Sequence, residues 1–298
     1  MDGVLLIDKP SGPTSHDVVA RLRSVTGERS IGHTGTLDPL ATGLLPLVLG
    51  KATRLSAHLT GGAKSYDATV RLGFFTDTDD ALGRPLADPS ATRPDEADIL
   101  AALEACRGSY DQVPPNHSAK KVGGRKAYDM ARVDAPLILE PVSVTVSSLE
   151  YLDRTDDLLR LTVTASAGFY VRSLARDLGR TLGCGAHLAA LRRTRSGAFD
   201  VAHALTLADA ERLGPGVLAH LVSPADALGD LPAVTVTPLG LTRALHGNPL
   251  NPGHMAGRSL PPSGGPVARL VRILDADGRL IALAHSRGGA LHPAVVLG

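Results

Sequence analysis

A single carboxylate lies in the glycine- and proline-rich stretch IGHTGTLDPLATGLLPLVLG, which spans residues 31–50. Asp38 is the one acidic residue of this stretch, and a run of apolar residues follows it. Glycines let a loop approach a ligand closely, and Pro39 restricts the residue before it to extended conformations. The stretch therefore holds Asp38 in a defined position, either as a side chain that closes a local turn or as a nucleophile.

A carboxylate that acts as a nucleophile must stay ionised, and a buried one keeps its charge only beside a cation. The candidate cation is Arg172, in the segment SAGFYVRSLARDLG. It falls in the first turn of a predicted helix, where the helix dipole disfavours a positive charge. We therefore expect Arg172 to have an anionic partner, the alternative being a surface arginine that reaches water.

Charge is unevenly distributed along a chain whose net charge is +1. Residues 77–111 hold nine acids and three bases, whereas 172–195 hold six arginines and one acid. Residues 117–132 hold five lysines and arginines and one acid. One charged run is typical of a solvated face, but two basic runs on a near-neutral chain favour a polyanionic partner such as nucleic acid.

Tyrosines near two of these motifs could supply the stacking surface that an unstacked nucleic-acid base needs. The chain has only five tyrosines and four phenylalanines. Tyr66 lies two residues after Lys64 at the start of a predicted strand, and Tyr170 lies two residues before Arg172. Core packing with a solvated hydroxyl is the alternative for either tyrosine.

The sequence lacks the patterns that are typical of nucleotide-binding and metal-binding sites. The chain has no phosphate-binding glycine loop, and its histidines show no metal-ligand spacing, so we expect neither a nucleotide cofactor nor a metal. The acids at 77–80 predict a turn, because the closing glutamate of a calcium loop is missing. Two distant cysteines, no signal peptide and no apolar run of about 20 residues predict a cytoplasmic protein, which we expect to be a monomer.

Apolar periodicity predicts the elements that position these residues. It indicates strands at 4–7, 44–50, 66–74, 143–152 and 158–166, and helices at 15–27, 51–59, 94–106 and 170–183. Ser15 and Gly27 have the residue types of helix caps. Composition changes near 222–232, and an Asp-Gly turn predicts a hairpin at 267–284. We expect a mixed α/β domain over 1–225 and a small β-rich module over 232–298.

Long segments of the chain resemble a known family. They are, in order, DKPSGPTSHDVV, GHTGTLDPLATGLLPLVLGKATRL, KSYDATVRLG, TDTDDALG, VPPNHSAKKVGGRKAYDMAR, GFYVRSLARDLG and CGAHLAALRRTRSGAF. Over about residues 3–200 the chain resembles the bacterial TruB family, the tRNA pseudouridine-55 synthases. The tail resembles, less strongly, a PUA-type RNA-binding module. The resemblance implies a central mixed, largely antiparallel sheet flanked by helices, with a PUA-like module at the C-terminus.

The resemblance implies an isomerisation without cofactor or metal. A uridine in the T-arm loop of tRNA is flipped into the pocket, its N-glycosidic bond is cleaved, the uracil turns, and C5 is joined to the sugar. The family's nucleophile falls on Asp38, its partner arginine on Arg172, and its stacking tyrosine, which also helps to remove the C5 proton, on Tyr66. The substrate-binding residues that the resemblance implies are His33, Lys9, Tyr170, Leu191, Lys120 and Lys121, the last two in an RNA-clasping insertion at 117–140.

The chain departs from the family at 165–170, where it reads ASAGFY and the family often has Cys-Ser-x-Gly-Thr-Tyr. The tyrosine and the following arginine are retained. Three alternatives remain open. The first is a protein that binds and folds tRNA without modifying it. The second is a hydrolase or glycosidase, for which a second carboxylate is needed. The third is the same chemistry on another RNA.

Overall fold

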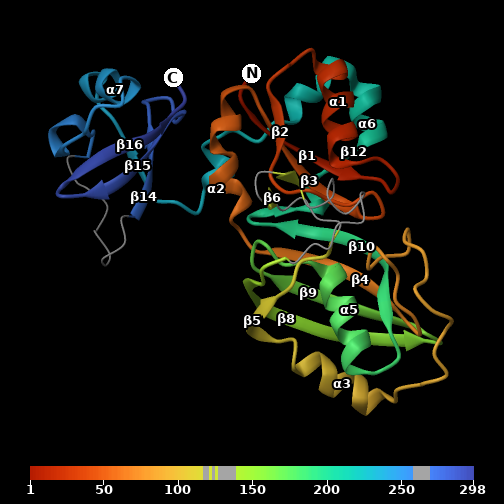
Figure 1. The fold of residues 1–298 in the computed structure, drawn as a ribbon. Helices are drawn as coiled ribbons and strands as arrows, with labels where there is room; N and C mark the ends of the chain where they lie inside the picture. Colours follow the sequence, from red (N-terminus) through yellow and green to blue (C-terminus); the bar gives the residue numbers. More distant parts are fainter. Residues whose placement is uncertain (117–120, 123–124, 127–138, 258–268) are drawn as a thin grey trace.

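The computed structural model describes residues 1–116, 121–122, 125–126, 139–257 and 269–298. A large body is built on one long sheet, and a smaller lobe at the C-terminal end lies beside it (Figure 1). No helix among these residues is long and apolar enough to cross a membrane.

Ten strands of the described chain form one sheet. Across the sheet they run β12 (Leu205–Thr206), β1 (Gly3–Lys9), β3 (Thr42–Leu49), β10 (Ala186–Ser196), β4 (Lys64–Leu72), β9 (Leu158–Ala165), β8 (Val142–Thr155) and β5 (Gly108–Gln112), while β2 (Ile31–His33) pairs with β3 and β11 (Phe199–Asp200) with β10. Only the β1–β12 and β3–β10 pairings among them are parallel. The predicted mixed, largely antiparallel sheet is confirmed.

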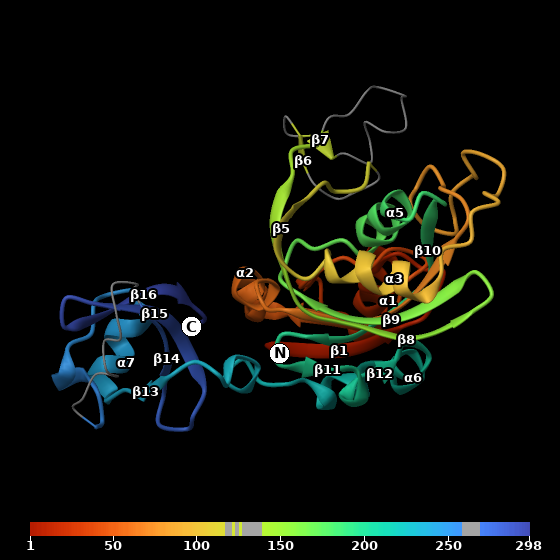
Figure 2. The same ribbon diagram turned by 90° about the horizontal axis from the view of Figure 1, so that it is seen from below.

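Helices pack on the sheet and at its edge. They are α1 (Ser15–Thr26), α2 (Ser56–Thr60), α3 (Glu96–Glu104), α5 (Val171–Thr181) and α6 (Leu207–Leu213). The helices α3 and α5 lie on the same side of the sheet (Figure 2), and side chains of α1, α3 and α5 share one apolar cluster with the strands.

Alternate residues of a strand point to opposite faces, and both faces of β1 are covered. Leu5 and Ile7 belong to the cluster that α1, α3 and α5 cover. Val4 and Leu6 belong to a second cluster, which includes the segment 52–59 and residues from the C-terminal lobe. Burial on both faces explains why the start of the chain reads as an unbroken apolar run rather than as an alternation.

The C-terminal lobe has its own four-stranded sheet in the order β13 (Ala233–Thr235), β14 (Arg269–Leu274), β15 (Leu280–Arg287) and β16 (Ala290–Val296), with α7 (Pro238–Leu245) packed on it. The predicted hairpin is β14–β15. Hydrogen bonds join lobe and body: the guanidinium of Arg272 donates to the Ala225 carbonyl at 2.7 Å, and that of Arg54 to the Val296 carbonyl at 2.7 Å. The boundaries 1–225 and 232–298 remain a prediction.

Some element ends differ from expectation. The N-cap of α1 is Thr14 rather than Ser15, because the Thr14 hydroxyl accepts from the Asp17 amide in a capping box. The predicted helix at 51–59 is a 3-10 turn over Gly50–Leu55 followed by the short α2. In the predicted insertion the structure describes two short paired strands, β6 (Lys121–Val122) and β7 (Arg125–Lys126). Lys120 lies outside the described residues.

Candidate active site

A cavity of about 440 Å³ opens where the loop after β2, the start of β4, the start of α5 and the middle of β10 meet. Its size falls within the usual range for small-ligand sites. It is lined by His33, Gly35, Thr36, Leu37, Asp38, Thr60, Lys64, Tyr66, Ala167, Gly168, Phe169, Tyr170, Val171, Arg172, Leu191 and Arg193.

Asp38 and Arg172 form an ion pair in this cavity. The Oδ1 atom of Asp38 accepts a hydrogen bond from Nη2 of Arg172 at 3.1 Å, and Oδ2 lies 2.9 Å from Nε. The Arg172 side chain is 5% exposed, whereas that of Asp38 is 35% exposed. The carboxylate is therefore held on its inner side by a buried cation and is open to the cavity on its outer side, as a nucleophile requires.

The backbone at the start of α5 aims Arg172 inward. Gly168 takes a φ of +91°, a conformation that L side chains rarely adopt, just before the helix begins. The side-chain amide of Gln112, on β5, forms two hydrogen bonds with the backbone of Tyr170. Its oxygen accepts from the Tyr170 N–H at 2.8 Å, and its nitrogen donates to the Tyr170 carbonyl at 3.1 Å. The α5 N-terminus is thus fixed from the far edge of the sheet.

The acidic turn at 77–80 lies behind Arg172. The carbonyl of Thr78 accepts from Nη1 of Arg172 at 3.0 Å, and Oδ2 of Asp80 lies 3.8 Å from its Nε. Asp80 is buried, and its Oδ1 accepts from the Thr78 hydroxyl and the Leu82 amide. The expectation of a turn is confirmed, but the turn also supplies a second carboxylate to the arginine.

Two residues near the N-terminus fasten the Asp38 loop. The Ser15 hydroxyl accepts from the Leu37 amide at 2.8 Å and donates to the Leu37 carbonyl at 3.0 Å. The Nζ of Lys9 donates to the Ala41 carbonyl at 2.7 Å and to that of Pro10 at 2.8 Å. Burial lowers the pKa of Lys9 to about 8. These bonds fix the backbone on both sides of Asp38.

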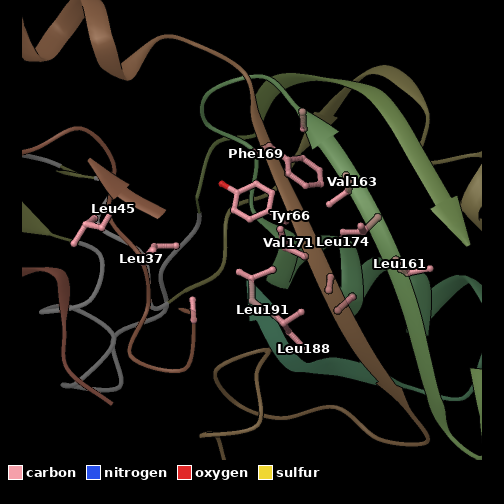
Figure 3. Close-up of a cluster of buried hydrophobic side chains, with 14 of the residues drawn as sticks. Leu37, Leu45, Tyr66, Leu161, Val163, Phe169, Val171, Leu174, Leu188 and Leu191 are labelled. Carbon is pink, nitrogen blue, oxygen red and sulfur yellow. The ribbon is translucent and has the colours of Figure 1, made fainter. Parts of the chain in front are cut away.

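Tyr66 lies on β4 between the cavity and the core. Its ring stands beside Phe169, and its hydroxyl points away from the core, to the side on which Leu37 lies (Figure 3). The residue is 8% exposed and belongs to the main apolar cluster. Burial raises the pKa of the Tyr66 hydroxyl, while the neighbouring Arg193 works in the opposite direction.

Two further cations lie close to Tyr66. Arg193 is buried, and its Nε and Nη2 donate to the carbonyls of Leu44 at 2.8 Å and Gly35 at 3.1 Å. The Nζ of Lys64 donates to the carbonyls of residues 60 and 62, both at 2.7 Å. Burial and the neighbouring Arg193 lower the pKa of Lys64 to about 8.

His33 stands at the cavity rim in its neutral form. Burial, helped by His16 and Arg193, lowers its pKa. Its Nδ1 accepts from the Gly35 amide at 3.4 Å, so the neutral ring carries its proton on Nε2. The Nε2–H group is then a donor available to a ligand.

The cavity gathers most of the predicted site residues. Asp38, Arg172, Tyr66, His33, Tyr170 and Leu191 all line it. Lys9 is not among the lining residues, since it lies beneath the loop, and the side chain of Lys121 is outside the described part of the chain.

The sequence did not predict the residues that support the site. Ser15 binds the backbone of Leu37, Asp80 lies near Arg172, and Gln112 binds the backbone of Tyr170. The buried cations Lys64 and Arg193 were not predicted either. For Arg193 a weak signal existed, because it lies in the basic run 172–195. Within the described residues, no group of three or more histidines, cysteines or acids has a metal-binding arrangement.

Comparisons with known proteins agree on one family. The model of the TruB family pseudouridylate synthase N-terminal domain matches residues 23–171, and that of the tRNA pseudouridylate synthase B C-terminal domain matches 172–228. A tRNA pseudouridine synthase B of Thermobifida fusca is 43% identical over 305 residues, covering 99% of this chain and 98% of the relative. One of Gloeobacter violaceus is 42% identical over 302 residues, covering 100% and 99%.

Solved structures show the same fold. A chain from the crystal structure of the archaeal box H/ACA sRNP Nop10–Cbf5 complex matches with a TM-score of 0.73 and 26% identity, over 99% of this chain and 86% of that one. A chain of a Cbf5–Nop10–Gar1 complex matches with a TM-score of 0.72. Because the family models and the relatives together account for nearly the whole chain, it belongs to the TruB family of pseudouridylate synthases, which are isomerases.

Proposed function

We propose that the chain converts the uridine at position 55, in the T-arm loop of tRNA, to pseudouridine. The names of its curated relatives, tRNA pseudouridine synthase B, support tRNA as the substrate. The observation that carries the proposal is the ion pair of Asp38 with Arg172, which stands in the same cavity as Tyr66 and leaves the carboxylate open to a ligand. A uridine from a loop enters such a cavity at a cost of only a few kcal/mol.

In the proposed reaction the Asp38 carboxylate acts at C1′ of the flipped uridine, and the N-glycosidic bond breaks. The freed uracil turns within the cavity, and its C5 then joins C1′. Both bonds belong to one nucleotide, and substrate and product have the same atoms and the same number of electrons. The protein therefore has to orient the base and keep one carboxylate ionised, and no cofactor takes part.

The other cavity residues receive roles from their positions. We assign the stacking face to Tyr66 and the side walls to Tyr170 and Leu191, all of which line the cavity. The neutral His33 would donate from Nε2 to the RNA at the rim. A neutral donor suits this place, because the buried cations behind it already supply positive charge.

Two lysine assignments differ in their support. For Lys9 we propose a positioning role, because its Nζ is bound to carbonyls of the Asp38 loop rather than open to the cavity. For Lys120 and Lys121 we keep the role of phosphate contacts in an RNA-clasping insertion at 117–140. That role rests on the basic sequence and on the family resemblance.

We also propose that 1–225 form the catalytic domain and that 232–298 form a PUA-like RNA-binding module. The separate sheets of body and lobe support this division. The enzyme would act as a monomer in the cytoplasm, where tRNA is matured.

A glycosidase reading is less well supported by the geometry. Glycosidases use two carboxylates on either side of the scissile bond. The second acid near Arg172 is Asp80, which is buried and hydrogen-bonded within its own turn. Asp80 is not among the cavity-lining residues.

The decisive experiment measures tritium release from C5-labelled uridine in an unmodified tRNA transcript. We expect the wild type and the control Asp67→Asn, an exposed acid beside Tyr66 in the chain, to release tritium, and Asp38→Asn to release none while its tRNA affinity stays within a few fold. Mapping should place the product at the T-loop uridine. Tight tRNA binding without release by the wild type would instead favour a protein that folds tRNA, and release at another site would favour another RNA substrate.

A further inference from the structure

Arg193 is a buried cation with no acidic partner among the described residues, and it lies against Tyr66. It is 1% exposed. Other arginines of β10 are paired with acids: Arg192 lies 2.7 Å from Asp8, and Arg195 lies 3.8 Å from an aspartate. Burying an arginine without a carboxylate is costly, so a purely structural position would favour an apolar residue of similar size.

The register of the sheet places Arg193 and Tyr66 together. They are directly opposite each other in the antiparallel pairing of β10 with β4, so their side chains leave the same face as near neighbours. Both line the cavity. The guanidinium donates to the carbonyls of Gly35 at 3.1 Å and Thr36 at 3.5 Å, and its positive charge acts on the Tyr66 hydroxyl. One side chain thus connects the tyrosine with the Asp38 loop.

We propose that Arg193 is a positioning residue that fixes the Tyr66 hydroxyl against the rotated base and stabilises the phenolate that removes the C5 proton. This inference rests on the proposed pseudouridine reaction. It assigns a role to the positive charge of Arg193, which takes no part in the ion pair of Asp38 with Arg172.

The proton-transfer step balances without any further reagent. After C5 has joined C1′, the C5–H bond breaks and its proton goes to the Tyr66 phenolate. The C5–H electron pair forms the C5=C6 double bond, and the N1=C6 pair returns to N1, which takes a proton from water. The phenol then passes its proton to water, so one proton leaves C5 and one arrives at N1.

The charges around the hydroxyl agree with this role. Burial raises the pKa of Tyr66, nearby Asp38 raises it further, and Arg193 lowers it. The other ionisable groups that line the cavity are His33, whose pKa burial lowers, the phenol of Tyr170, and the cations Lys64 and Arg172. Among these groups, Arg193 is the cation directly opposite Tyr66 in the sheet. Burial lowers the pKa of Arg193, but an arginine starts from so high a value that it stays charged.

The test compares Arg193→Gln and Arg193→Lys with the wild type in single-turnover reactions on tRNA. Each reaction uses uridine that carries hydrogen or deuterium at C5, across a range of pH. We expect Arg193→Gln to lower the rate by about 10- to 100-fold, as for the loss of a hydrogen bond to a charged group. Its C5 isotope effect should increase, and its rate should level off at a higher pH. Arg193→Lys keeps the positive charge, so its rate and isotope effect should lie between those of the wild type and those of Arg193→Gln.

The control is Arg192→Gln, whose side chain pairs with Asp8 rather than with Tyr66. It should leave the isotope effect and the pH profile as in the wild type. A slower Arg193→Gln with an unchanged isotope effect and pH profile would show that Arg193 only supports the loop, and would overturn the inference.

If Arg193→Gln does not fold, the same criterion applies to Arg193→Lys: a slower rate with an unchanged isotope effect overturns the inference. A wild type that forms no pseudouridine in any tRNA overturns the proposed function itself. If the wild type is active but the Arg193 variants slow the reaction without changing the isotope effect, only the inference about Arg193 is overturned.

Discussion

Arg172 and Arg193 line one cavity, but they keep their charges in different ways. Arg172 is neutralised by carboxylates, with Asp38 at 2.9 Å and Asp80 at 3.8 Å. Arg193 is held by three backbone carbonyls and lies directly opposite Tyr66 in the sheet. Carbonyl dipoles solvate a cation without cancelling its charge. The first arginine therefore fixes an anion in place, and the second keeps a positive potential inside the cavity.

This difference assigns separate tasks to two residues of the same type. A carboxylate next to Arg193 would hold the guanidinium equally well but would remove its effect on Tyr66. If only carbonyls held Arg172, the ion pair that fixes the Asp38 carboxylate in the cavity would be absent. The partners, rather than the arginines themselves, decide what each position does.

The sharpest way to break the comparison is Arg172→Gln. It leaves Asp38 and Asp80 facing each other without a cation, and removing one partner of a buried pair costs about 3–5 kcal/mol. We expect pseudouridine formation to fall by about 10³-fold, more than for Arg193→Gln, together with a lower melting temperature. The exposed Arg180→Gln, further along the same helix, is the control. Equal losses for the two cavity arginines would remove the distinction between them.

Ser15→Ala tests whether the position of the Asp38 carboxylate depends on the hydrogen bonds that hold its loop. The substitution leaves the Leu37 amide and carbonyl without their partner, at a cost of about 1–3 kcal/mol. We expect a lower free energy of unfolding in urea and a turnover about 10-fold slower, because a small displacement of Asp38 slows the chemistry. Ser24→Ala, on the exposed face of the same helix, should change neither. A stability loss at full turnover would show that Asp38 is placed by other contacts.

Replacing Lys120 and Lys121 together by Gln distinguishes the role of cations outside the cavity, in tRNA binding, from the role of the cavity cations, in the reaction itself. We expect weaker tRNA binding and a salt dependence of the binding constant that is flatter by about one to two counterions, with the single-turnover rate at saturating tRNA little changed. Titrations at several salt concentrations measure this. An unchanged salt slope would contradict the clasp.

The smallest effect concerns the pH dependence of stability at Lys64. Its pKa in the folded chain is about 8 against 10.5 for the free side chain, so the unfolded chain binds more protons between these values. The contribution of Lys64 to stability is therefore least below pH 8 and rises towards pH 10.5. Relative to Lys64→Met, the wild type should gain about 2 kcal/mol between pH 7.5 and 10 in urea unfolding. The exposed Lys51→Met should follow the wild type.

The local parts of the site were predictable from the sequence. The glycines and proline around Asp38 signalled a shaped loop, and the dipole argument required an anion for Arg172, which the ion pair supplies. The strand β10, in contrast, was not predicted. Its register shifts at Leu188/Ala190 and Arg193/Arg195 interrupt the alternation that marks a strand.

The supporting residues were missed because their partners are distant in the chain. Ser15 reads as a helix cap until the structure shows its hydroxyl on Leu37, while Thr14 takes the cap. The acids at 77–80 read as a turn, which they form, but nothing local shows that Asp80 faces Arg172. Such pairings depend on the order of strands in the sheet, which periodicity does not determine.

The second apolar cluster limits how the C-terminal lobe can be studied by truncation. Leu280, Leu283 and Leu297 of the lobe pack in the same cluster as Val4 and Leu6 of β1. A chain that ends before β13 would expose this face of the sheet to water and would tend to aggregate. Loss of activity in such a fragment would report on solubility rather than on RNA recognition. Point substitutions on the outer surface of the lobe, with β14–β16 left in place, are the informative alternative.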